Sequence, residues 1–376
     1  MLNSGEPPIS DGKVLSAVLE APERMVLRQF DLPEIHEDDG LLQVEVAGIC
    51  HTDVGLYHGT TKYALPLIMG HEIVGRIAKI GPAAAQRWGV QEGDRVTVES
   101  KVRCGFCRAC VAGDYKYCSG GLSYGTRASC ARPPHLWGSY GQYMYLAPGT
   151  LLYKVPVGIS AEIANLLTVA ISNGIQWVVL RGGAKLGDAV VVQGVGPIGL
   201  CCIAAAKEAG AGPIIATGLA ADGYRLALSR EFGADVVVDV EAEDVVERVR
   251  DTTGGDMADL AVDVTGSGAA VRASLQLVRP LGTVVSAGVT GDGTLTPLPL
   301  DTLLYNEIRL QGVFSYDTHA VRRAMALAQR GRYPFHKLVT HRFPLDQAER
   351  AVKTAGREIP GQAPIKVLIL PNGAPG

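Results

Sequence analysis

The fold of the second half of this chain is decided by the stretch Asp188-Ala189-Val190-Val191-Val192-Gln193-Gly194-Val195-Gly196-Pro197-Ile198-Gly199. It reads as a buried strand that ends in a GxGxxG turn, and an apolar helix follows. The first glycine permits the turn, the second lets backbone approach a pyrophosphate, and the third lets the helix pack on the strand. The helix N-terminus offers N–H groups to phosphate. The motif in this context predicts NAD or NADP at Gly194, Gly196, Pro197, Ile198 and Gly199.

Outward from this turn, further short apolar runs alternate with helical patterns from about residue 160 onward. Such alternation predicts a parallel sheet covered by helices on both faces, which is the Rossmann type of doubly wound fold. The other expected strands of this sheet are 213–217, 234–239, 260–266, 283–288 and 308–313.

The residue that selects between NAD and NADP follows the expected strand 213–217. NAD-preferring enzymes usually have an acidic residue there that holds the ribose 2′-hydroxyl. This chain has Gly218, and Arg225 follows within reach of a 2′-phosphate, which favours NADP. Asp222 can still reach the ribose, and Arg225 can instead cap the next helix. Both cofactors therefore remain open.

The first part of the chain shows short strands between turn signals and no long helix. Residues 42–46, 73–77 and 91–98 are examples, and they suggest a small, partly open barrel. Residues 1–13 are expected to form a loose tail. Residues 122–137, rich in Gly, Arg, Pro and Ser, read as a long loop over the active site or on the plain surface.

Four cysteines lie close together after the expected barrel strands. Their spacing is x2, x2, x7, which lets four thiolates surround one tetrahedral ion. A disulfide cluster and an iron–sulfur site are the alternatives. Because all four ligand positions are filled, a zinc ion here would be structural, and it would fold a loop too small for its own core. The residues are Cys104, Cys107, Cys110 and Cys118.

A second group of metal-ligand types is Gly48-Ile49-Cys50-His51-Thr52-Asp53 followed by Gly70-His71-Glu72. Thiolate, imidazole and carboxylate are the three side-chain types that bind zinc. Cys50 follows an alternating strand, so a strand end would hold it. A Cys and a His about twenty residues apart also occur by chance as core residues, and the flanking sequence decides between the two interpretations.

These two segments, the cysteine spacing and the glycine-rich turn resemble the zinc-dependent alcohol dehydrogenases of the medium-chain dehydrogenase/reductase family, over about Val14 to Leu370. Sorbitol, threonine and butanediol dehydrogenases belong to the same group. The resemblance implies a GroES-like catalytic domain (1–160), a Rossmann domain (161–314) and a C-terminal return to the first domain (315–376). It implies two zinc ions per chain: a structural one on the four cysteines, and a catalytic one on Cys50 and His71, with Glu72 able to move into or out of the coordination shell.

The resemblance also assigns proton transfer, oligomeric state and reaction. Thr52 would hydrogen-bond the substrate oxygen, and His51 would contact the pyrophosphate or take over proton transfer. Relatives are dimers or tetramers, through sheet edges near 283–288 and 306–312. The implied reaction moves a hydride between a primary or secondary alcohol, or the matching aldehyde or ketone, and NAD(P).

Several positions depart from the pattern of the relatives. A Glu or a Cys usually completes the catalytic ligand set, whereas this chain has Asn165 and Thr168 there. Glu72 would then bind zinc directly, with Asn165 holding the water, or zinc would be weak or absent. Gly55 stands where a relay histidine is common, and His58 is expected to be a satisfied loop histidine. Lys366 is expected to be solvated.

Composition narrows the class of protein further. A net charge of -3 argues against a nucleic-acid partner, and no apolar run approaching the ~20 residues needed to cross a bilayer is evident. The N-terminus lacks the apolar segment of a signal peptide. A cytoplasmic protein with a small-molecule substrate is therefore expected. Two other hypotheses remain: a zinc-independent NADPH reductase of conjugated carbonyls, and an inactive nucleotide-binding relative.

Overall fold

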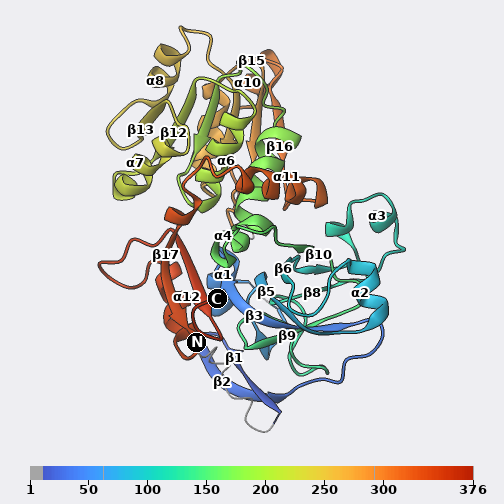
Figure 1. Cartoon of the computed structure of the whole chain (residues 1–376). Helices are drawn as coiled ribbons and strands as arrows, with labels where there is room; N and C mark the ends of the chain where they lie inside the picture. The colour runs from blue at the N-terminus through green and yellow to red at the C-terminus, as the bar shows by residue number, and fades with distance from the viewer. Residues whose placement is uncertain (1–11, 62, 292, 376) are drawn as a thin grey trace. The chain divides into compact units, whose positions relative to one another are not determined.

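A computed structural model describes residues 12–61, 63–291 and 293–375. Contacts between residues divide the chain into two compact units. Unit 1 runs to Thr168 and resumes at Phe335, and unit 2 comprises Val169–Pro334. In Figure 1, unit 1 accordingly carries both the blue beginning and the red end of the colour scale. Apart from its last two residues, the expected tail 1–13 lies outside the described residues.

Unit 1 is built on two main sheets and a small third one. The first sheet has the strand order β2-β1-β4, and β7 pairs with β8 in the small one. The largest sheet has the order β10-β6-β5-β3-β18-β17, and β9 also pairs with β3. The strands are β1 (Lys13–Ala21), β2 (Arg24–Asp31), β3 (Gly40–Gly48), β4 (Leu67–Ile68), β5 (Glu72–Ile80), β6 (Arg95–Val98), β7 (Lys101–Val102), β8 (Leu122–Ser123), β9 (Tyr143–Leu146), β10 (Leu152–Lys154), β17 (Val339–Pro344) and β18 (Lys366–Leu370).

Short helices connect these strands, and the apolar faces of the sheets enclose one core that includes Leu42, Ile73 and Val367. Strand β3 lies between β5 and β18, so both of its edges are paired and its side chains are almost all buried. The end of β3 is therefore a rigid place from which to project a functional side chain. The helices are α1 (His51–Tyr57), α2 (Pro82–Trp88), α3 (Arg108–Val111), η1 (Tyr115–Tyr117), α4 (Ala161–Leu166), η5 (Phe335–Leu338), η6 (Leu345–Gln347) and α12 (Ala348–Ala355).

Two parts of unit 1 were not fully predicted from the sequence. The return segment adds strand β17 and helix α12 before β18, and neither was predicted. The segment 122–137 is not a plain surface loop, because Tyr124, Leu136 and Trp137 are buried, which agrees with the interpretation that its last residues pack the loop down. The Tyr124 and Trp137 rings stack with centroids 6.2 Å apart.

Unit 2 contains a six-stranded sheet of order β13-β12-β11-β14-β15-β16, and every pairing in it is parallel. This confirms the predicted Rossmann arrangement. All the strands that the sequence predicts here are present. They are β11 (Val190–Gln193), β12 (Ile214–Gly218), β13 (Val236–Asp239), β14 (Ala258–Asp263), β15 (Val278–Ser286) and β16 (Arg309–Gly312).

Helices cover both faces of this sheet (Figure 1). Successive side chains of a strand point to opposite faces of the sheet. On one face, Val191 belongs to an apolar cluster with Val249 of α8 and Leu275 of α9. Helix α6 also packs against the sheet, at β11 and β12. The helices of unit 2 are α5 (Ser172–Gly174), η3 (Ile175–Arg181), α6 (Pro197–Glu208), η4 (Ala220–Asp222), α7 (Gly223–Glu231), α8 (Val245–Thr252), α9 (Gly268–Leu277), α10 (Leu300–Tyr305) and α11 (Thr318–Gln329).

The expectation that no apolar run approaches the length of a membrane span was wrong for one helical stretch. Residues Ala161–Arg181, which include the π-helical turn η2 (Leu167–Ile171), form 21 helical residues that are long and apolar enough to cross a membrane by length and composition. However, 78% of the most apolar 18-residue stretch of this helix is buried inside the protein. That burial is typical of a core helix, which explains the composition without a bilayer.

Candidate metal and cofactor sites

The four clustered cysteines lie in a lobe formed by α3 and η1. All four are free thiols, and their sulfur atoms lie within 4.8 Å of one another. Two sulfur pairs, Cys104–Cys110 and Cys107–Cys118, are 3.9 Å apart. A tetrahedral zinc ion with bonds of about 2.3 Å requires sulfur atoms about 3.8 Å apart. The lobe therefore fits one mononuclear ion.

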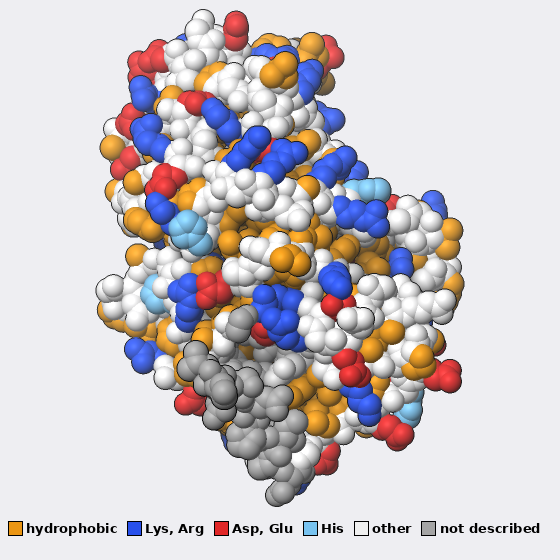
Figure 2. Space-filling view, in the orientation of Figure 1, with side chains coloured by type: hydrophobic (Ala, Val, Ile, Leu, Met, Phe, Trp, Pro, Cys, Tyr) orange, Lys and Arg blue, Asp and Glu red, His pale blue; other side chains and the backbone are white. Residues whose placement is uncertain are grey.

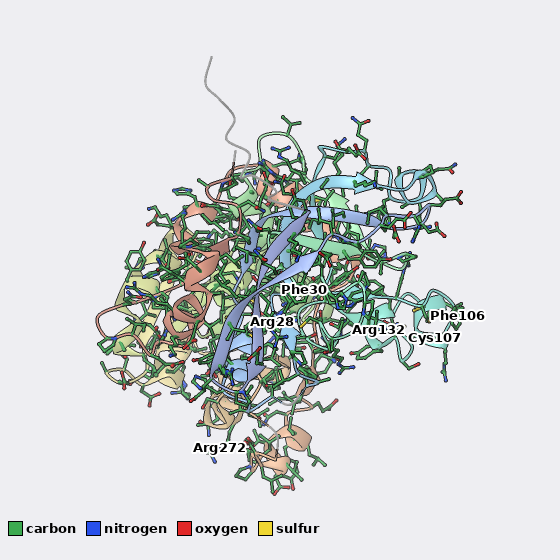
Figure 3. The ribbon with its side chains drawn as sticks, turned by 90° about the horizontal axis from the view of Figure 1, so that it is seen from below. Arg28, Phe30, Phe106, Cys107, Arg132 and Arg272 are labelled. Carbon is green, nitrogen blue, oxygen red and sulfur yellow. The ribbon has the colours of Figure 1, made fainter. Side chains whose placement is uncertain are left out.

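Local backbone geometry prepares this lobe for a cation. Hydrogen bonds from the backbone N–H groups of Phe106 and Cys107 lower the pKa of the Cys104 thiol to about 6, which favours the thiolate that binds metal. By contrast, burial raises the pKa of Cys110 to about 12, so a cation would have to displace its proton. Phe106 is 81% exposed (Figure 3), as expected where a lobe has almost no apolar core.

The second metal-ligand group forms at the end of β3 and the start of β5. Cys50, His71 and Glu72 place one ligand atom each within 4.8 Å of one another. Cys50 follows β3 and caps α1, and Glu72 is the first residue of β5, which pairs with β3. Glu72 is 1% exposed. Three donors of the types that zinc prefers thus converge from two paired strands, and this donor set fits the ion.

Lys366 joins this group from the far end of the chain. Its Nζ contacts Oε2 of Glu72 and donates to the carbonyl oxygen of Ile49 at 3.0 Å. Lys366 is 4% exposed, so the expectation of a solvated lysine was wrong. The reason is the pairing of β18 with β3, which puts the first residue of β18 beside the strand end that carries Cys50. A buried carboxylate needs such a partner.

The two positions that depart from relatives have definite contacts. Asn165 of α4 is buried and donates from Nδ2 to the Glu72 carbonyl oxygen at 3.0 Å. A side chain on Gly48 would lie 2.2 Å from Asn165 Oδ1 and 2.3 Å from Glu72 Oε2, so glycine is needed there. The Thr168 hydroxyl lies 3.2 Å from that of Thr97.

Helix α1 carries the residues expected to handle protons. The Thr52 hydroxyl is 3.9 Å from Cys50 Sγ, whereas His51 is exposed. Asp53 is fully buried and accepts a hydrogen bond from the Cys50 N–H at 2.9 Å. Its other oxygen lies 3.4 Å from Nδ1 of His71. Burial opposes a charge on His71, but Asp53 and Cys50 outweigh it and raise the pKa of the imidazole well above its ordinary value.

The structure also explains Gly55, which lies within α1, and His58, which follows that helix. A side chain at Gly55 would come within 2.8 Å of the Thr61 hydroxyl, which disfavours a relay histidine there. His58 lies between Glu23 and Glu358, 2.8 Å from each carboxylate. Bonds to Glu358 and Glu23 raise its pKa. His58 is thus a satisfied loop histidine, as the sequence suggests.

The glycine-rich turn has the geometry that phosphate binding requires. Gly194 follows β11 with φ +99°, a conformation that favours glycine. A side chain on Gly199 would lie 1.9 Å from the Gly194 carbonyl oxygen, whereas nothing lies within 4 Å of one on Gly196. Pro197 is the first residue of α6. The space above Gly196 and the N–H groups at the start of α6 can therefore receive a pyrophosphate.

The end of β12 carries more negative charge than the sequence suggests. Arg225 pairs with Asp222 at 3.2 Å. Glu241, from the loop after β13, accepts a hydrogen bond from the Ala220 N–H at 2.9 Å. A side chain on Gly218 would meet Val195 at 2.9 Å, so glycine is required for packing. Sequence analysis missed Glu241 because it lies 23 positions beyond Gly218 and only the parallel pairing of β12 with β13 brings their ends together.

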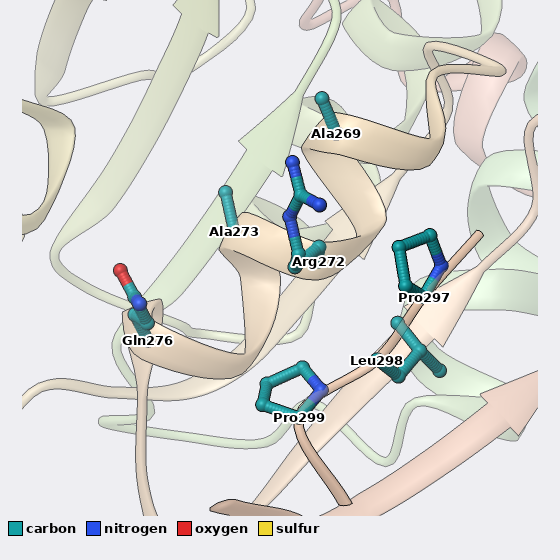
Figure 4. Close-up of a pocket in the computed structure, with 7 residues that line it drawn as sticks. All are labelled: Ala269, Arg272, Ala273, Gln276, Pro297, Leu298 and Pro299. Atoms are coloured by element: carbon teal, nitrogen blue, oxygen red, sulfur yellow. The ribbon is translucent and has the colours of Figure 1, made fainter.

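A separate hollow of about 530 Å³ lies along α9 in unit 2 (Figure 4). It is open, and its lining combines small and apolar side chains with the polar side chains of Arg272 and Gln276. None of its residues belongs to the glycine-rich turn or to either metal-ligand group. The lining residues are Ala269, Arg272, Ala273, Gln276, Pro297, Leu298 and Pro299.

Comparisons with known proteins agree with this organisation. Residues 36–157 match the alcohol dehydrogenase GroES-like domain, and residues 197–330 match the zinc-binding dehydrogenase family. The chain is 44% identical to a protein named "Probable alcohol dehydrogenase adh" from Mycobacterium tuberculosis, over 96% of this chain and all of that one. It is 31% identical to erythritol/L-threitol dehydrogenase of Mycolicibacterium smegmatis, covering 96% and 98%.

Among solved structures, a zinc-binding dehydrogenase from Sinorhizobium meliloti bound to NADP superposes with a TM-score of 0.84. The two chains are 27% identical, and the match covers 96% of this chain and 99% of the other. The chain therefore belongs to the zinc-type alcohol dehydrogenases of the medium-chain dehydrogenase/reductase family. The predicted GroES-like and Rossmann folds are confirmed, and so is the oxidoreductase class, which works with zinc, a nicotinamide cofactor and a small alcohol or carbonyl substrate.

Proposed function

We propose that this enzyme holds two zinc ions per chain, a structural one on the cysteine lobe and a catalytic one on Cys50, His71 and Glu72. The convergence of those three side chains carries the second assignment. A carboxylate has two oxygens, so Glu72 can offer one to the metal while the other keeps its contact with Lys366. Neither Asn165 nor Thr168 is needed as a ligand in this arrangement.

The protein's own residues prepare the site for oxidation of an alcohol. Zinc, when bound, supplies a Lewis acid that polarises the substrate oxygen. Thr52, beside Cys50, provides a hydroxyl that accepts the proton leaving the substrate and passes it on, with exposed His51 as the route to solvent. Asp53 fixes the orientation of the His71 ring. A bound NAD(P) would supply the nicotinamide that accepts the hydride, and the Gly194–Gly199 turn would hold the pyrophosphate of that dinucleotide.

The number of zinc ions tests this proposal directly. Protein purified without chelator should contain two zinc ions per chain by elemental analysis, and Cys50→Ser and Cys104→Ser should each contain one. Cys130→Ala, which removes a buried thiol outside both groups, should keep two. One zinc in the native chain, unchanged by Cys50→Ser, would contradict the catalytic site and favour the zinc-independent reductase or the inactive relative.

We further propose that NAD is the preferred cofactor. The carboxylates of Asp222, Asp239 and Glu241 gather where β12 and β13 end, and Arg225 is paired with Asp222. A ribose 2′-hydroxyl can donate to a carboxylate, whereas a 2′-phosphate would be repelled. The Sinorhizobium meliloti relative is bound to NADP, so the choice needs its own measurement.

Titration of both reduced cofactors measures this preference. NADH should bind at least about tenfold more tightly than NADPH, a difference of about 1.4 kcal/mol. Glu241→Gln should reduce the preference for NADH over NADPH, because it removes a negative charge and keeps an oxygen that can accept a hydrogen bond. Glu247→Gln on the exposed first turn of α8 is the matched control and should leave the ratio unchanged. Tighter binding of NADPH to the native protein would overturn the assignment.

We also propose a homodimer or homotetramer in the cytoplasm. The outer edge of β16 has no neighbouring strand among the described residues. Large apolar side chains are exposed nearby in sequence, and on the face in Figure 2 orange side chains reach the surface among basic and acidic ones. All eight cysteines are free thiols, which suits a reducing compartment. The exposed side chains are Val289, Leu295, Leu300, Leu304 and Tyr305.

A further inference from the structure

Among the described residues, several buried polar atoms beside the Cys50 group have no hydrogen-bond partner, Asn165 Oδ1 and Ser139 Oγ included, and three others are relevant here. They are Oδ1 of Asp53, Nδ1 of His71 and the hydroxyl oxygen of Tyr140. Asp53 and Tyr140 are both fully buried. Leaving a buried polar group without a hydrogen-bond partner is unfavourable, because the group has lost its contact with water. Their concentration at one place indicates that they satisfy one another when the site is in its working geometry.

Backbone pairing places Tyr140 beside His71. The Tyr140 N–H donates to the Met69 carbonyl oxygen at 3.0 Å, and the Ser139 N–H donates to that of Gly70 at 3.1 Å. A side chain on Gly70 would lie 2.4 Å from Cδ1 of the Tyr140 ring. The ring therefore lies against the residue that precedes His71.

The charges around the phenol decide its role in a hydrogen bond. Burial raises the pKa of Tyr140 well above its ordinary value, and the nearby carboxylates of Asp53 and Glu72 and the thiol of Cys50 raise it further. The hydroxyl therefore keeps its proton and is a donor. Asp53 uses Oδ2 to accept from the Cys50 N–H, which leaves Oδ1 as the acceptor that faces His71.

We propose that Tyr140 is a positioning residue of the catalytic metal site: its hydroxyl donates to Oδ1 of Asp53 and so fixes the carboxylate that orients the His71 ring. The inference rests on the proposed zinc site at Cys50, His71 and Glu72. Asp53 then contacts both the backbone N–H of one zinc ligand, Cys50, and the imidazole of another, His71. Tyr140 completes the set of hydrogen bonds around that carboxylate.

Tyr140→Phe tests the inference, because it removes one oxygen atom and keeps the ring. The dissociation constant for zinc at the Cys50 site, measured by competition with a chelator, should rise about tenfold, since groups that orient a metal-ligating histidine usually contribute 10- to 100-fold. Asp53→Asn should raise it at least as much. Adding Tyr140→Phe to Asp53→Asn should then change it by less than twofold, because both act through the same bond.

Two controls separate this role from simple destabilisation. Tyr124 is also fully buried, and its hydroxyl lies 2.6 Å from that of Thr150 and accepts from the Ala147 N–H. Tyr124→Phe should lower stability but leave zinc affinity unchanged. If it weakens zinc binding as much as Tyr140→Phe does, or if Tyr140→Phe leaves zinc affinity at the native value, the proposal is wrong.

A readout without metal distinguishes failure of this inference from failure of the zinc site. In zinc-free protein, the proton shared by His71 Nδ1 and Asp53 should give a low-field proton NMR resonance that is absent from His71→Asn. Tyr140→Phe should shift that resonance, and Tyr124→Phe should not. A native chain that takes no zinc at Cys50 sinks the proposed function, and the resonance still decides the role of Tyr140: an unshifted signal overturns it.

Discussion

Replacing Lys366 with methionine is expected to lower the free energy of unfolding of the zinc-free protein by about 3–5 kcal/mol, because it leaves a buried carboxylate without its partner. Lys366 is 4% exposed and Glu72 is 1% exposed, so water cannot replace the lost ammonium group. Lys366 Nζ also donates to the Ile49 carbonyl oxygen, which would lose this partner. Chemical denaturation followed by circular dichroism measures the change.

The matched control is Lys353→Met, which breaks a pair of the same chemistry near the surface. Lys353 and Glu349 are 2.7 Å apart, and their side chains are 37% and 38% exposed. Exposed pairs of this kind contribute about 0–1 kcal/mol. If Lys366→Met is no more destabilising than Lys353→Met, the Lys366–Glu72 pair contributes no more to stability than an exposed pair, which contradicts the prediction. Zinc should recover part of the loss in Lys366→Met, since a cation beside Glu72 replaces the missing charge.

The second large effect is expected at the glycine-rich turn. A methyl group on Gly199 would lie 1.9 Å from the backbone oxygen of Gly194, which cannot move without displacing α6 from β11. Gly199→Ala should therefore lower the free energy of unfolding by about 1–3 kcal/mol. It should also weaken NADH binding, because the helix N-terminus shifts. Denaturation and fluorescence titration measure the two effects.

Gly196→Ala separates packing from cofactor contact within the same turn. Nothing lies within 4 Å of a side chain at Gly196, and its φ of -70° suits any residue. Stability should stay within about 0.5 kcal/mol of the native protein, while NADH affinity should fall about tenfold because the methyl group occupies the approach of the pyrophosphate. Unchanged affinity would place the cofactor elsewhere, and native-like stability of Gly199→Ala would contradict the close packing.

Features encoded over a few neighbouring residues could be predicted from the sequence. The strand–turn–helix around Gly194 and Gly199 is one, because a positive φ and a close helix contact each demand glycine at a set spacing. The four-cysteine lobe is another, since its first three thiols lie within a single seven-residue stretch. The parallel sheet could be predicted because its strands alternate with helices, although β15 begins at Val278, five residues before the expected strand 283–288.

Features that depend on distant strand pairing could not be predicted in this way. Lys366 and Glu72 are 294 positions apart, and only the pairing of β18 with β3 brings them together. Tyr140 carries no local sequence signal of a role, and only its backbone bond to Met69 places it beside His71. The helix over Ala161–Arg181 is a further case, because its composition does not say whether protein or lipid surrounds it, and only the tertiary structure shows that it is mostly buried inside the protein.

The sequence by itself therefore determined the family, both fold types, the two groups of metal-ligand residues and the cofactor turn. These depend on residue types at short, fixed spacings, where local backbone geometry leaves few alternatives. The tertiary structure alone decided which charges surround Glu72, what orients His71, and how acidic the end of β12 is. Those properties arise because strands far apart in the sequence pair side by side and bury polar groups together, so each group's partner is set by the sheet.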